Sequence, residues 1–71
     1  MSKAVIWLER AIRLAPDDPV IHEHLGDVYW HIERPLEARY KWQFAYEMYS
    51  DEATRKLVTE KIKSGLSQEL D

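Results

Sequence analysis

The sequence predicts an all-α fold in which four antiparallel helices stack into one domain spanning residues 1–66. Three observations support this prediction. Apolar residues recur at helical spacing in four segments, Pro and helix-capping residues separate the segments, and the connections are so short that consecutive helices should run antiparallel. With 45% apolar and 32% charged residues among 71, the composition is that of a folded domain and not of a disordered chain.

The first helix is expected at about residues 2–15, where Ser2 can cap its N-terminus and Pro16 stops it. The second is expected at about residues 19–33, with Pro19 in its first turn. On a helical wheel the large apolar residues of the second helix share one side: Ile21, Leu25, Val28, Tyr29 and Ile32. This side is predicted to face the core.

The third helix is expected at about residues 35–49, because Pro35 disfavours helical geometry in the residue before it. The fourth is expected at about residues 51–64, and Gly65 is a natural C-terminal stop. The polar tail, residues 67–71, is predicted to be frayed.

An internal repeat links the first and third helices. Both carry a small–large–small set of residues, 34 positions apart: Ala4, Leu8 and Ala11 recur as Ala38, Trp42 and Ala45. Gly26 lies inside the second helix, where glycine costs about 1 kcal/mol relative to alanine. A partner helix that crosses closely at Gly26 would explain its presence.

With these features the chain resembles the tetratricopeptide repeat family, whose pattern is W-x2-L-G-x2-Y, then A-x3-F, then A and P. The corresponding positions are His22, Leu25, Gly26 and Tyr29, then Ala38 and Trp42, then Ala45. Three positions depart from the pattern: His22 replaces the usual aromatic, Ser50 the terminal Pro, and Glu60 the next Gly. The resemblance implies one full hairpin between the second helix of an earlier repeat and a closing helix. The chain is also similar to the C-terminal end of longer bacterial repeat proteins. An unrelated four-helix bundle is the alternative that amphipathic pattern alone leaves open.

The resemblance implies a protein-interaction module. In such a stack each helix is covered by its neighbours, and the helix that would precede the first one is missing. We therefore expect association into a homodimer or higher homo-oligomer through the uncovered first helix and part of the third. The candidate residues are Val5, Ile6, Trp7, Leu8, Ile12, Tyr40 and Phe44. Two alternatives stay open: the four helices rearrange to bury this surface, or a longer natural chain supplies the missing helix.

A second candidate surface is the concave face, which binds peptides in the family and is lined by the first helix of each hairpin. By this resemblance the partner-binding residues are Val20, Glu23, Asp27, Trp30 and His31. The helical wheel selects the same set, because Trp30 lies opposite Leu25 and Ile32. An aromatic ring away from the core is typical of a binding anchor. The equal alternative is that Trp30 packs against the fourth helix.

No catalytic residue or cofactor is predicted. The chain has no Cys, no Gly-rich phosphate loop and no recognisable nucleophile motif, so an enzyme is not expected. His24, Asp27 and His31 could converge on one face of the second helix as metal ligands. No further ligand from another element is evident, and no metal site is predicted.

Charge and hydropathy limit the other partners. The net charge is −3, and acidic residues interleave with the basic residues of the second half, so no nucleic-acid partner is expected. No apolar run is long enough for a membrane span or a signal peptide. We expect no membrane association and a cytoplasmic location, unless the chain is part of a longer exported protein.

Overall fold

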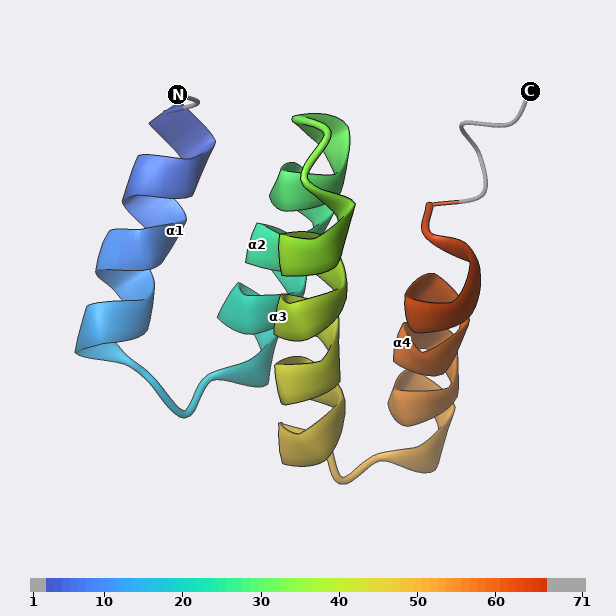
Figure 1. Ribbon diagram of the computed structural model, residues 1–71. Coiled ribbons are helices and arrows are strands. Elements are labelled where there is room, and N and C mark those ends of the chain that lie inside the picture. The colour runs from blue at the N-terminus through green and yellow to red at the C-terminus, as the bar shows by residue number, and fades with distance from the viewer. Residues whose placement is uncertain (1–2, 67–71) are drawn as a thin grey trace.

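The computed structural model describes residues 3–66, which form four α-helices and thereby confirm the all-α prediction (Figure 1). The helices are α1 (Lys3–Leu14), α2 (Pro19–His31), α3 (Pro35–Met48) and α4 (Glu52–Ser64). The proposed cap Ser2 and the tail 67–71 lie outside the described residues. The predicted helix ends that can be compared agree to within one residue, except at the end of α2.

The helices lie side by side in chain order. Contacts between helices join α1 to α2, α2 to α3 and α3 to α4, and the closest pair is α2 and α3. Figure 1 shows α1 and α4 on opposite sides of this central pair. The molecule measures 30 × 29 × 16 Å, and a helix with its side chains is about 10–12 Å wide. The stack is therefore a thin slab whose two outer helices each have one side open.

α2 ends two residues earlier than predicted because the chain turns sharply at Glu33. Glu33 has a left-handed backbone conformation, with φ 64°. Its N–H donates to the Trp30 carbonyl at 3.1 Å, and the Arg34 N–H donates to the Tyr29 carbonyl at 2.9 Å. This pair of bonds is the Schellman arrangement, in which glycine is the usual left-handed residue. Because the residue at this position is not a glycine, the local stop signal was Pro35, two residues later, and the predicted helix was too long.

The core lies along the α2–α3 contact and extends to one residue of α1, to the middle of α4 and to the segment just after α4. Its buried apolar residues are Val5, Leu25, Tyr29, Ala38, Trp42, Ala45, Val58 and Leu66. The second copy of the repeated triplet, on α3, is completely buried, whereas Ala4 of the first copy is exposed. The position of each helix in the slab accounts for this difference, since α3 has neighbours on two sides and α1 on one.

Gly26 marks the closest approach of α2 and α3, as the sequence predicted. A Cβ atom built on Gly26 would lie 2.5 Å from Cδ1 and Nε1 of Trp42 and 3.0 Å from the Ala38 carbonyl oxygen. Trp42 is the largest completely buried side chain. Its indole therefore occupies the space that the missing Gly26 side chain leaves.

We expect Gly26→Ala to lower stability. The added methyl group forces Trp42 to move, and overpacking of this kind costs about 1–3 kcal/mol. The higher helix propensity of alanine recovers only about 1 kcal/mol. Thermal unfolding followed by circular dichroism should show a lower Tm. Ser64→Ala, an exposed change in the last turn of α4, is the control and should leave the Tm unchanged or raise it. A Gly26→Ala protein more stable than the parent would contradict the close approach.

Candidate interaction surfaces

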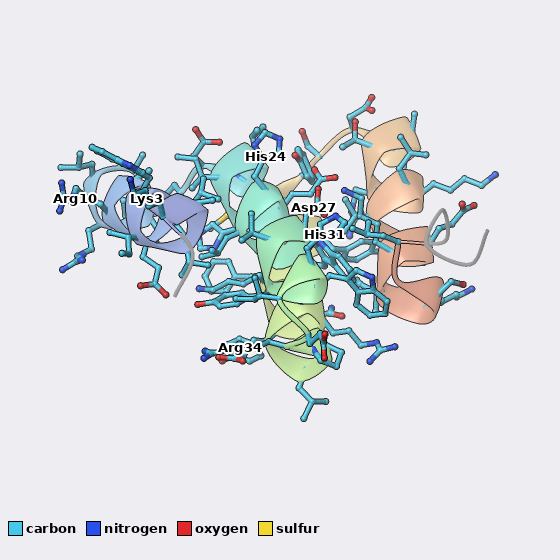
Figure 2. The ribbon with its side chains drawn as sticks, turned by 90° about the horizontal axis from the view of Figure 1, so that it is seen from above. Lys3, Arg10, His24, Asp27, His31 and Arg34 are labelled. Atoms are coloured by element: carbon cyan, nitrogen blue, oxygen red, sulfur yellow. The ribbon has the colours of Figure 1, made fainter. Side chains whose placement is uncertain are left out.

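A groove of about 590 Å³ runs between α2 and α4 on the predicted concave face. Its polar lining includes Glu23, Asp27 and His31 from α2 and Glu60, Lys61 and Lys63 from α4. Figure 2 shows Asp27 and His31 on the side of α2 that faces α4, whereas His24 projects away from it. Within residues 3–66, no group of three or more His, Asp or Glu side chains is arranged to hold a metal ion.

Lys61 connects the two walls of the groove. Its Nζ donates to Glu23 Oε2 at 2.7 Å and to Asp27 Oδ1 at 3.0 Å. Each carboxylate also accepts a bond from the α3 side: Tyr49 Oη donates to Glu23 Oε1 at 2.7 Å, and Trp42 Nε1 donates to Asp27 Oδ1 at 2.9 Å. This polar network joins α2, α3 and α4 through groups that are all at least partly buried.

The environment keeps Glu23 and Lys61 ionised. Burial by itself raises the pKa of Glu23, but the hydrogen bonds from Lys61 and Tyr49 outweigh it and hold that pKa below its ordinary value. Burial likewise favours a lower pKa for Lys61, and the hydrogen bonds to Glu23 and Asp27 raise it above normal. Burial and the bond to Glu23 raise the pKa of Tyr49. The ion pairs of Lys61 with Glu23 and Asp27 therefore hold α4 against α2.

Trp30 packs against the end of α4, as the second of the two sequence-based alternatives expected. Its ring meets the Trp42 ring with centroids 5.9 Å apart, and the Arg39 guanidinium lies 5.8 Å from its centroid. A side chain on Gly65, directly after α4, would collide with the Trp30 ring. Of the predicted concave-face residues, Val20 and His31 are the exposed ones, at opposite ends of α2.

The α1 residues predicted for self-association divide into a covered and an exposed set. The prediction that Val5 lacks a cover is wrong, because Val5 is completely buried in the core. Leu8 and Ile12 pack partly against the same core. These three residues share the α2-facing side of the helix, since they lie three and four positions apart. Ile6 and Trp7 are exposed, and Trp7 keeps 64% of its surface accessible.

The exposed side of α1 also carries positive charge, which the search for apolar residues overlooked. We define the α1 outer face as Lys3, Ile6, Trp7, Arg10, Arg13 and Leu14, all exposed. Figure 2 shows Lys3 and Arg10 on the side of α1 that points away from the rest of the molecule. The Arg10 guanidinium lies 5.2 Å from the centroid of the Trp7 ring. A helical wheel that scores charge as well as apolarity would have found this face.

α3 presents the other exposed apolar surface. We define the α3 stripe as Leu36, Tyr40 and Phe44, which follow one another at four-residue spacing. Leu36 is 80% and Tyr40 73% exposed, while Phe44 stacks on His22 with ring centroids 4.5 Å apart. His22, at the position of the family's aromatic, is buried and donates from Nε2 to the Pro16 carbonyl at 3.0 Å. Leu36 was not among the predicted contact residues.

No protein-family model, curated protein or solved structure matches this chain. No helix within residues 3–66 is both long and apolar enough to cross a membrane.

We expect Lys61→Met to destabilise the fold by about 1–3 kcal/mol, because it leaves the partly buried carboxylates of Glu23 and Asp27 without their positive partner. The midpoint of urea unfolding measures the loss. Lys56→Met removes the same charge from an exposed position of α4 and serves as the matched control. If both variants unfold at the same urea concentration, the network contributes no net stability.

The lowered pKa of Glu23 predicts acid sensitivity. A carboxylate whose pKa is lower in the folded state stabilises the fold fully above its unfolded value, near 4.5, and loses this effect as the pH falls through the folded value. The free energy of unfolding should therefore decrease below about pH 4.5. In Glu23→Gln this decrease should be shallower, as measured by urea unfolding at a series of pH values. An equal slope in both proteins would exclude Glu23 as a source of the acid sensitivity.

Proposed function

We propose that this chain is a protein-interaction module of the tetratricopeptide type that associates with a second copy of itself. Support for the family comes from the spacing of the repeat residues and from the close crossing of α2 and α3 at Gly26 and Trp42, where the family pattern has Gly and Phe. Support for the function comes from the surface of the molecule. The cytoplasm is the compartment we propose for it.

The observation that carries the proposal is the exposure of Trp7, Leu36 and Tyr40. Each keeps well over half of its surface accessible, although the core between the helices is closed. Burying a large apolar side chain contributes about 1.5–3 kcal/mol. Aromatic residues at the centre of a contact contribute most to binding between proteins. Burial of these side chains against a second copy would therefore stabilise a complex.

The geometry of the slab also favours association at α1. α1 packs mainly on α2, and its outer face stays exposed within residues 3–66. In a helical repeat the corresponding face is closed by another helix. A second copy can supply that helix without any other component.

The α2–α4 groove is the second candidate surface, for a short peptide. Glu60 and Lys63 line it and stay exposed, and neither belongs to the Lys61 network. With Trp30 packed against the end of α4, such a peptide would be held mainly by charged groups, whose contacts at an exposed surface are weak.

The first test of self-association is Trp7→Glu. We expect light scattering across a dilution series to show a reversible dimer for the parent chain. Trp7→Glu should weaken it roughly 30-fold, as expected for the loss of an aromatic contact worth about 2 kcal/mol. Helical content should persist, because Trp7 lies outside the core.

Leu57→Glu is the matched control, since Leu57 is 63% exposed on α4, at the opposite side of the slab. It should leave the dimer intact. A parent chain that stays monomeric at every concentration, or equal weakening by both variants, would count against the proposal.

A further inference from the structure

The proposed self-association leaves open which surfaces of the two copies meet, and the charges around the apolar residues indicate an answer. On the α1 outer face, Lys3, Arg10 and Arg13 surround Ile6 and Trp7. The described part of the chain gives none of these three basic side chains an ion-pair partner. The face is therefore both apolar and positively charged.

The one acidic residue of α1 is already engaged. Glu9 lies on α1 beside the core-facing side, and its Oε2 accepts a hydrogen bond from Tyr29 Oη at 2.7 Å. This bond ties Glu9 to α2, so its carboxylate is directed away from the outer face. The positive charge of the outer face is not neutralised from within its own helix.

The α3 stripe has the opposite character. Glu37 and Glu47 are exposed beside it, whereas Lys41 at its edge is partly buried. Glu37 has an exposed ion pair with Arg34 at 3.5 Å, and Glu47 accepts only a long hydrogen bond, 3.4 Å, from Gln43. Exposed pairs of this kind are weak and leave the carboxylates able to change partner.

The stripe also has room for an incoming side chain. A hollow of about 290 Å³ lies on α3, with Tyr40, Phe44, Met48 and Glu47 in its lining. Aromatic and methionine side chains are typical of the centre of protein interfaces. A ring carried on a positively charged helix would find apolar walls and a carboxylate there.

Charge distinguishes the three ways in which two copies could pair. Two α1 outer faces would bring six basic side chains together without an acid, and two α3 stripes would oppose their carboxylates. Like charges placed opposite each other suppress association. We propose that the α1 outer face of one copy packs on the α3 stripe of a second copy, with Trp7 in the hollow beside Tyr40 and Phe44. A twofold axis repeats the contact, so that each copy provides one α1 and one α3.

Charge reversal tests the pairing. Arg10→Glu/Arg13→Glu makes the α1 outer face acidic, and Glu47→Lys makes the α3 stripe basic. Each variant alone would place like charges opposite each other, so we expect its dimer to be weaker by at least about tenfold in sedimentation or light scattering. An equimolar mixture has opposite charges at both contacts and should form a heterodimer within about threefold of the parent affinity.

Two controls accompany the mixture. The three altered positions are exposed. Glu47→Lys places a positive charge in the last turn of α3, which favours a helix, whereas Arg13→Glu places a negative charge in the last turn of α1, which slightly disfavours it. Circular dichroism should therefore show helical content close to that of the parent for each variant alone. The parent dimer should also weaken as salt is raised, since exposed charges are screened.

The outcomes separate this inference from the proposed function on which it rests. If the parent chain is dimeric but the equimolar mixture of the two variants stays monomeric, the chain self-associates without contact between α1 and α3. The same conclusion follows if only one of the two variants loses its dimer. A parent chain that is monomeric at all concentrations overturns both proposals.

Discussion

The fold depends on the position of the Trp42 indole. The ring fills the space above Gly26, lies against Trp30, and donates its N–H to Asp27. One side chain of α3 therefore fixes the distance to α2 and helps to orient a carboxylate on the α4-facing side of α2. A smaller residue at 42 would leave a cavity in the core and the carboxylate without one of its donors. Lys61 can bridge α2 and α4 because Trp42 and Tyr49 hold the two acceptors in place.

This arrangement determines which surfaces remain for binding. α4 lies along the face predicted to be concave, where Lys61 pairs with Glu23 and Asp27 and the end of the helix covers Trp30. The large apolar side chains left exposed are concentrated instead on α1 and α3. The charged network therefore covers the α2–α4 face, and apolar side chains remain available for binding on α1 and α3. For this reason we propose that α1 and α3 are the binding helices.

Sequence reasoning was most successful where burial repeats with the period of a helix. Leu25 and Tyr29 were placed on the core-facing side of the second helix from spacing alone, and Gly26 identified the close helix crossing. It was least successful where the answer depends on contacts distant in the chain. Glu33 takes a glycine-like conformation without a local signal. Whether Trp30 is open is decided by the register of α4, which begins 22 residues further on and carries no repeat motif.

The thin slab has a consequence for how the molecule opens. Each helix contacts mainly its neighbours in the chain, and such local topologies fold fast and come apart unit by unit. α1 is held on one side only, so it is the unit whose detachment exposes the least of the core, chiefly the site of Val5. Detachment of α1 from α2 and its packing in the proposed dimer would then compete with each other. A second copy packed on its outer face would confine α1 from both sides and slow amide exchange along it, before any change in global stability is felt.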